Sequence, residues 1–235
     1  MRTYYNGEIK DIIEIVDDYN HIVNVMRLSV GDKLIVFNGS NYDYETEIIQ
    51  IDKKKIVCKL IKKIENKIKS SFVTVFQAVL KGDKLDYLVQ KLTEVNVEQL
   101  VLFESEFTIS KWKDDKLKKL EKISIEACKQ CGRSVPLKIE FEKNIKSIIN
   151  QFKNYDRIVF AYERSENSLK EVLSKLKHNT VGLVVGSEGG FSEEEAQLIN
   201  SSNNVECVSL GNTILRAETA SLTLSAVTIY ENALP

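Results

Sequence analysis

A glycine-rich segment near the C-terminus has the residue types of a ligand-binding turn. It runs GSEGGF over residues 186–191 and follows the short apolar run Val181–Val185. A β-branched run of this length predicts a buried parallel strand, and glycines allow a tight turn and a close approach to a ligand. Ser192 and Glu195 form a capping box, so we expect a helix from about Glu193. This order is typical of ligand sites in open α/β sheets.

The charge around this turn restricts the ligand. A helix N-terminus ordinarily favours anions, but the expected first turn holds Glu193, Glu194 and Glu195. A phosphate would meet three carboxylates there, and neither GxGxxG nor a P-loop motif occurs at this position. A ligand with an adenosine part and no phosphate fits better than NAD or ATP. The alternative is an ordinary strand–turn–helix connection, because glycine-rich turns are common.

A second polar group follows the last expected strand. The sequence LGNTILRAETAS over Leu210–Ser221 places Arg216, Glu218 and Thr219 at the start of a helix. An Arg/Glu/Thr group can orient a polar substrate or bind an anion. The alternative interpretation is helix capping with an Arg–Glu ion pair.

Metal and hydrolytic chemistry find little support in the sequence. The CxxC at Cys128 and Cys131 has no second pair, and the chain has two histidines, too few for a four-ligand zinc site. The pair ends an expected helix, which disfavours a thioredoxin-type motif. We therefore expect no metal site and no Ser/His/Asp triad.

Composition indicates a water-exposed protein with a substantial core. The 235 residues are 43% hydrophobic and 29% charged, and no apolar run is long enough to span a membrane. The N-terminus has no apolar signal region and the four cysteines are scattered, so we expect a cytoplasmic protein. Net charge is −1, but lysines cluster over residues 53–69 and 111–133. Such clusters suit binding to the phosphates of a nucleic acid. The alternative is that they are ordinary solvated faces of helices or hairpins.

The expected elements divide the chain into two domains. Residues 1–69 form a small β-barrel-like module with strands Lys33–Phe37, Tyr44–Ile51 and Lys55–Ile64 and a helix Asp17–Leu28. Residues 70–235 alternate strands and helices, which predicts a parallel sheet covered on both faces. Its strands are Phe72–Val79, Gln99–Phe103, Arg157–Tyr162, Val181–Val185 and Val205–Leu210. Its helices are Lys84–Asn96, Lys113–Lys129, Leu169–Leu176, Glu193–Ser201 and Ala217–Asn232.

The last helix is apolar nearly all round. A helix of this kind must be buried on several sides, which suggests that it also packs against a second subunit.

Five segments, in chain order, resemble the RsmE-type ribosomal RNA uridine-N3 methyltransferases. The first two are HI…MRL…VGD…VFNG between His21 and Gly39, and KGDKLD…QK…TE between Lys81 and Glu94. The third is EACKQCGRS…P between Glu126 and Pro136. The last two are the GSEGGF turn, which resembles a Gly-Pro-Glu-Gly-Gly-Phe loop, and LGNTILRAET from Leu210 to Thr219.

The departures from the family pattern are few. Ser187 stands where proline is usual, Asn96 where glycine is usual, and Asn212-Thr213 where a Pro-Arg-like pair is usual. Loss of that arginine is expected to weaken a substrate contact without changing the class.

The resemblance implies a SPOUT-type fold. This is an α/β parallel sheet with a C-terminal trefoil knot, preceded by a PUA-like β-barrel domain, in a homodimer formed through the C-terminal helix. General topology rules argue against knots, so the knot comes from the resemblance alone. The implied cofactor is S-adenosylmethionine, which has no phosphate. The residues expected to bind it are Tyr162, Gly186, Glu188, Gly189, Leu210, Gly211, Ile214 and Leu215.

The implied reaction is methylation of N3 of a uridine in 16S ribosomal RNA of the small subunit. Arg216 is expected to stabilise the uridine anion or hold a phosphate, Glu218 to act as base or orient Arg216, and Thr219 to contact the base edge. The target must be flipped or single-stranded. Expected RNA contacts are Arg27, Lys81, Lys84 and Arg133. A ribose 2′-O-methyltransferase of the same superfamily and a non-catalytic ribosome assembly factor are the alternatives.

Overall fold

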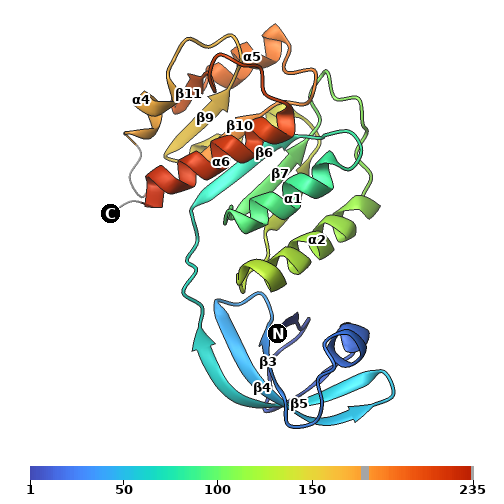
Figure 1. The fold of residues 1–235 in the computed structure, drawn as a ribbon. Helices are drawn as coiled ribbons and strands as arrows, with labels where there is room; N and C mark the ends of the chain where they lie inside the picture. Colours follow the sequence, from blue (N-terminus) through green and yellow to red (C-terminus); the bar gives the residue numbers. More distant parts are fainter. Residues whose placement is uncertain (176–179, 234–235) are drawn as a thin grey trace. The chain divides into compact units, whose positions relative to one another are not determined.

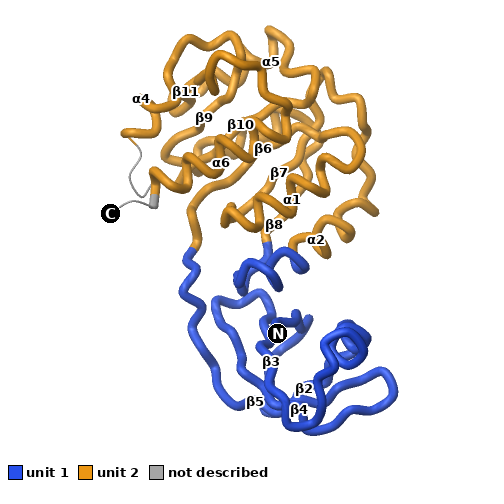
Figure 2. Tube along the Cα trace, in the orientation of Figure 1, with its two compact units in different colours: residues 1–69, 125–136 blue, residues 70–124, 137–235 orange. Residues whose placement is uncertain are grey.

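The computed structural model describes residues 1–175 and 180–233. The chain forms two compact units, which Figure 2 draws in different colours. Unit 1 comprises Met1–Lys69 and Ile125–Pro136, and unit 2 comprises Ser70–Ser124 and Leu137–Pro235. Unit 1 therefore includes a later segment of the chain that the sequence analysis assigned to the second domain.

Unit 1 is built on a five-stranded sheet with the order β1-β3-β4-β5-β2. The strands are β1 (Arg2–Tyr4), β2 (Ile12–Ile15), β3 (Lys33–Phe37), β4 (Tyr42–Asp52) and β5 (Lys55–Glu65). β1 pairs with β3 in parallel, and the other pairs are antiparallel. The hairpin of β4 and β5 is the longest pairing, and it contains two register shifts. Alternate residues of these strands, such as Leu34 and Val36, form the core of the unit.

The helix expected over Asp17–Leu28 is much shorter in the structure. The π-helix η1 covers His21–Val25, and Ile22 is its only fully buried residue among those described. Arg27 has a φ of 56°, a left-handed conformation that cannot continue a right-handed helix. β1 and β2 were not predicted individually, because three or four residues are too few to show a pattern.

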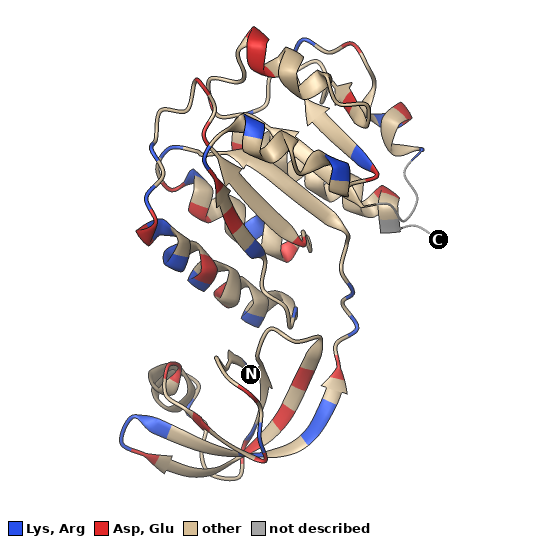
Figure 3. Ribbon diagram, turned by 180° about the vertical axis from the view of Figure 1, so that it is seen from behind, with Lys and Arg blue, Asp and Glu red and all other residues tan. Residues whose placement is uncertain are grey.

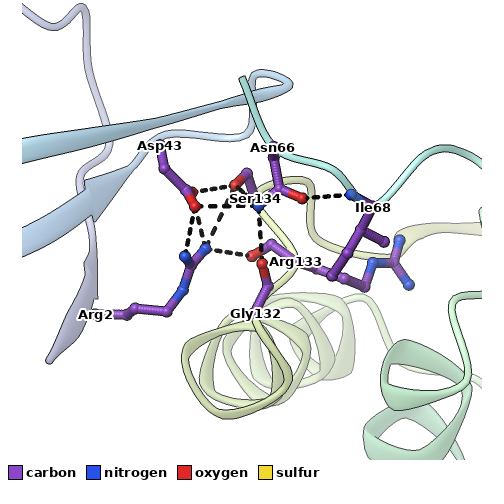
Figure 4. A network of polar contacts seen from close by, with 7 residues as sticks. All are labelled: Arg2, Asp43, Asn66, Ile68, Gly132, Arg133 and Ser134. Carbon is purple, nitrogen blue, oxygen red and sulfur yellow. Dashed lines mark hydrogen bonds and ion pairs between the residues drawn. The ribbon is translucent and has the colours of Figure 1, made fainter. Parts of the chain in front are cut away.

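A polar network attaches the second segment of unit 1 to its sheet (Figure 4). The Arg2 guanidinium lies 2.7 Å from the Asp43 carboxylate and donates a 3.0 Å hydrogen bond to the Arg133 carbonyl. The Asn66 amide donates to the Gly132 carbonyl at 2.9 Å. These bonds explain why the residues after the second long helix belong with the N-terminal strands.

Unit 2 contains a six-stranded sheet with the order β11-β9-β10-β6-β7-β8, and all its pairs are parallel. The strands are β6 (Val73–Ala78), β7 (Gln99–Phe103), β8 (Lys138–Glu142), β9 (Arg157–Ala161), β10 (Val181–Val185) and β11 (Val205–Val208). The five expected strands are present within one or two residues. β8 was not predicted, although its sequence KIEFE alternates charged and apolar residues, which is the pattern of a half-buried strand.

The helices of unit 2 lie on both faces of this sheet, as expected. They are α1 (Lys84–Glu94), α2 (Asp115–Cys131), whose last turns belong to unit 1, α3 (Ile145–Ile149), η2 (Phe152–Asn154), α4 (Leu169–Leu173), α5 (Glu193–Asn200) and α6 (Ala217–Ala233). Apolar residues of α1, α2, α4 and α6 share one core cluster, and those of α3, η2 and α5 share the other. Figure 1 shows α1 and α6 side by side over one face. The expected helix end Leu176 lies outside the described residues.

Helix α6 presents buried polar groups to the sheet. Ser221, Ser225 and Thr228 are fully buried, together with Leu224, whereas Tyr230 is 65% exposed. The strand order alone does not establish the knot, which stays a prediction. Among the described residues, no helix is long and apolar enough to cross a membrane.

Candidate functional site

A cavity of about 610 Å³ opens in unit 2 at the carboxyl ends of β9, β10 and β11. Its walls are the segments that follow these three strands, residues 161–163, 185–191 and 209–217, with Lys84 and Ala220. The three strands are neighbours in the sheet, where β9 lies between β11 and β10 although it comes before both in the chain. After β8 the chain crosses to the other side of β6, and ligand pockets form where strand order reverses in this way.

The glycine-rich turn forms one wall of the cavity. The Gly190 N–H donates a 3.0 Å hydrogen bond to the Ser187 carbonyl, and Gly190 has a φ of 71° that a side chain would strain. A Cβ on Gly189 would lie 2.7 Å from the Cβ of Phe107. The tight turn expected from the sequence is present, whereas the close contact at Gly189 is with the side chain of Phe107.

Buried polar groups hold this turn in place. The Gln77 side chain, fully buried at the end of β6, donates a 2.8 Å hydrogen bond to the Gly186 carbonyl. Ser187, which replaces the family's usual proline, is 5% exposed, and its hydroxyl has no hydrogen-bond partner among the described residues. Sequence reasoning missed Gln77. A lone amide in an apolar strand was the available signal, because a buried amide needs partners.

The expected capping box is present at the start of α5. The Ser192 hydroxyl accepts a 3.3 Å hydrogen bond from the Glu195 N–H, and the Glu195 carboxylate accepts a 3.1 Å bond from the Ser192 N–H. Glu193 pairs with Arg164 at 2.7 Å. None of the three glutamates of this turn is among the described residues that line the cavity; the carboxylates on its wall are Glu163 and Glu188. The sequence argument against a phosphate rested on glutamates that are not among the described lining residues, and the carboxylates that do line the cavity share its wall with Lys84 and Arg216.

The structure brings together all the residues expected to bind the cofactor. Tyr162 follows β9, the turn after β10 contributes three more, and the loop after β11 contributes the rest. The full set on the cavity wall is Tyr162, Gly186, Glu188, Gly189, Leu210, Gly211, Ile214 and Leu215. Ile214 is 90% exposed, so it offers an apolar side chain at the cavity surface.

The three expected catalytic residues have different positions. Arg216 is exposed and lines the cavity, whereas Glu218 and Thr219 follow it on α6 and are not among the described lining residues. The Glu218 carboxylate lies 3.9 Å from the ammonium of Lys84. Orientation of Arg216 by Glu218 therefore has no support from the contacts of Glu218.

Lys84, which the sequence analysis expected to contact RNA, lines the cavity. Its Nζ donates a 2.9 Å hydrogen bond to Glu188, which also accepts a 3.2 Å bond from the Lys81 N–H. Burial raises the pKa of Glu188, but these donors outweigh it and leave the pKa below its ordinary value. Glu188 is thus held as an anion on the cavity wall.

The other expected RNA contacts lie elsewhere. Lys81 and Arg27 are exposed. Arg133 is 6% exposed and its Nε–H donates a 3.1 Å hydrogen bond to the Val135 carbonyl in unit 1. A buried guanidinium is poorly placed to reach a phosphate, so the RNA contact expected of Arg133 has no support from its position. Lysines line the exposed side of α2 (Figure 3).

The CxxC motif contributes no metal site. Cys128 is buried, Cys131 is half-buried, and both are free thiols. Within residues 1–175 and 180–233, no group of three or more His, Cys, Asp and Glu side chains is placed to hold a metal ion.

The sequence of this chain matches known RNA methyltransferases over most of its length. Residues 67–229 match the model of an RNA methyltransferase domain, and residues 16–61 match an RNA methyltransferase PUA domain. Ribosomal RNA small subunit methyltransferase E of Rickettsia conorii is 30% identical over 96% of this chain and 93% of its own length. The Bacillus subtilis protein of the same name is 31% identical over 90% and 87%.

Solved structures share the fold over nearly the whole chain. A methyltransferase from Legionella pneumophila in complex with S-adenosylmethionine has a TM-score of 0.87 and 25% identity, with 98% of this chain and 97% of that chain covered. Ribosomal RNA small subunit methyltransferase E from Neisseria gonorrhoeae, at 22% identity with the same coverage, has a TM-score of 0.87.

Proposed function

The chain belongs to the RNA methyltransferase family, and from this membership we propose that it methylates N3 of a uridine in 16S ribosomal RNA with S-adenosylmethionine as donor. The observation that carries the proposal is the cavity at the ends of β9, β10 and β11. It brings the eight expected cofactor residues and Arg216 to one place. The family relationship supplies the RNA substrate, and the choice of uridine N3 follows the motifs of the sequence.

The cavity fits S-adenosylmethionine in size and chemistry. Its volume of about 610 Å³ lies within the usual range for small-molecule sites. The glycine-rich turn offers backbone N–H and C=O groups, and Leu210, Ile214 and Leu215 offer apolar contacts for an adenine. The wall carries Glu163 and Glu188 beside Lys84 and Arg216, and because Glu188 is paired with Lys84, the Glu163 carboxylate is the group left to attract a sulfonium cation.

The proposed reaction transfers a methyl group from sulfur to nitrogen. The cofactor supplies the methyl group when it is bound. N3 of uridine must lose its proton to solvent water, and the resulting anion, which spreads onto the neighbouring carbonyl oxygens, accepts the methyl group. Arg216, exposed on the cavity wall, is the proposed group that stabilises this anion. Thr219 is proposed to contact the base edge. Glu218 is proposed to support the site indirectly, by its ion pair with Lys84.

The RNA-binding surface is proposed to include the PUA-like unit and the lysines of α2. Arg27 and Lys81 are exposed cations that suit phosphate contacts. Because N3 is hidden in a base pair, the target nucleotide is proposed to be flipped out or single-stranded. Affinity for RNA should fall steeply with salt, and a flat response would contradict a phosphate-binding surface.

The proposed assembly is a homodimer that acts on small ribosomal subunits in the cytoplasm. The support for dimerisation is the outer face of α6, where Val227 and Tyr230 are exposed and no charged residue separates them.

Primer extension on 16S ribosomal RNA tests the function. RNA from cells with and without the chain is reverse-transcribed, and purified subunits from the deficient cells are then treated with the protein and S-adenosylmethionine. An N3 methyl group blocks the Watson–Crick edge, so we expect a stop at one uridine that depends on the protein. A ribose methyl group leaves that edge free, so a pause seen only at limiting nucleotide concentration would indicate the 2′-O-methyltransferase. No stop at either nucleotide concentration would indicate a non-catalytic assembly factor.

A further inference from the structure

Lys84 lies between two carboxylates that come from separate parts of the chain. Its Nζ is 2.9 Å from Glu188 Oε1 in the glycine-rich turn and 3.9 Å from Glu218 Oε2 in the first turn of α6. Lys84 itself is the first residue of α1. One ammonium group therefore contacts both the turn after β10 and the helix that follows the loop after β11.

The burial of these groups makes the contact important. The side chain of Glu218 is 13% exposed, and among the described residues its Oε2 has no hydrogen-bond partner. The ion pair with Lys84 is thus what compensates this carboxylate for lost hydration. Removing Lys84 leaves the largely covered Glu218 carboxylate without its cation, which is costly, whereas Glu188 is 25% exposed and keeps the Lys81 N–H.

We propose that Lys84 is a positioning residue of the cofactor pocket, which holds the glycine-rich turn and the start of α6 together by bridging Glu188 and Glu218. The inference rests on the proposed function, because it takes the cavity as the S-adenosylmethionine site. Arg216 lies two residues before Glu218, so the same bridge fixes the start of the helix that carries it. This role replaces the RNA contact that the sequence suggested for Lys84.

Cofactor binding by the purified full-length protein tests the bridge. Lys84→Met removes the ammonium and keeps most of the side-chain length. We expect its Kd for S-adenosylmethionine, measured by calorimetry, to rise about tenfold or more, the effect of losing a charged hydrogen bond. Lys84→Arg should recover part of the affinity. Lys91→Met is the matched control, because Lys91 lies on the same helix and pairs with Glu94 at 2.7 Å.

The pH dependence of binding separates positioning from general structural support. Three groups surround the Glu188 carboxylate. The Lys84 ammonium, on α1, and the Lys81 N–H, in the preceding turn, both donate hydrogen bonds to it, and Glu218 lies on the other side of Lys84. In the wild type the pKa of Glu188 is lowered, so the bridge persists above that pKa and is lost as pH falls through it. Lys84→Met has no bridge to lose, so the fall in affinity that the wild type shows as pH drops through the pKa of Glu188 should be absent in this variant.

A double variant completes the test. In Lys84→Met/Glu188→Gln, one uncompensated charge is removed, so we expect a weaker loss of affinity than the two single losses combined. Wild-type cofactor affinity in Lys84→Met, with a normal melting temperature, would overturn the inference. Loss of RNA affinity with unchanged cofactor affinity would also overturn it and restore the RNA role. A wild-type protein that does not bind S-adenosylmethionine would instead contradict the proposed function.

Discussion

Arg216 and Glu218, two of the three expected catalytic residues, differ in how exposed they are at the cavity. Arg216 is exposed on the cavity wall, whereas Glu218 is largely covered and pairs with Lys84. An exposed cation at the cavity surface suits a charge that develops on the substrate, and a covered carboxylate suits support of its neighbours. The two residues are close in sequence, but the structure separates their environments.

Arg216→Ala should abolish turnover and leave cofactor binding near normal. Loss of one donor to a developing anion typically lowers the rate by about a hundredfold to a thousandfold. Methyl transfer from radiolabelled S-adenosylmethionine to small subunits measures the rate, and calorimetry measures binding. Arg164→Ala is a suitable control, because Arg164 forms a surface pair with Glu193. Full activity in Arg216→Ala would remove Arg216 from the proposed mechanism.

At the scale of the element, the start of α5 is determined by its capping box. Ser192 and Glu195 each satisfy a backbone N–H of the other, and Glu195 also accepts a 2.8 Å hydrogen bond from the Glu106 N–H. The helix N-terminus thus orients the end of the glycine-rich turn. Elements set by such local bonds are the ones that sequence patterns predict best.

Ser192→Ala should lower the free energy of unfolding by about 1 kcal/mol, the usual effect of losing an N-cap hydroxyl. Thermal or denaturant unfolding followed by circular dichroism measures the change. Ser201→Ala at the other end of α5 is the control, since its hydroxyl donates to the Leu198 carbonyl and caps no N–H group. An equal effect at both positions would show that the capping box is not the reason.

At the scale of the whole molecule, the open question is assembly. The outer face of α6 exposes Val227 and Tyr230, at 39% and 65%, and carries no charge between Ala220 and Tyr230. An uncharged helix face of this kind suits contact with an equivalent face, because a two-fold axis pairs a surface with itself.

Light scattering of the full chain should therefore give twice the subunit mass of 26.8 kDa. Val227→Asp should shift the population toward the monomer, because it places two carboxylates at a self-complementary contact. Ile109→Asp adds a charge at another exposed apolar position and should leave the mass unchanged. A monomeric wild type would contradict dimerisation through α6 without affecting the assignment of the cofactor site.

Features that depend on neighbouring residues in the chain could be predicted from the sequence. These are the alternation of strands and helices in unit 2, the glycine turn and the capping box, whereas the loop residues of the cavity were expected from the family resemblance. Asn96, the departure from a usual glycine, has a φ of 70° and thus keeps the conformation that the position requires. Short-range patterns carry this information because the backbone and its caps respond to adjacent residues.

The tertiary structure alone decided which distant groups meet. Nothing near Lys84 in the sequence indicates Glu188 or Glu218 as its partners, and nothing near Gly132 indicates Asn66. Such side-chain partners meet only because the fold brings distant segments of the chain into contact. The charges of the cavity wall could therefore be assigned only once β9, β10 and β11 lay side by side.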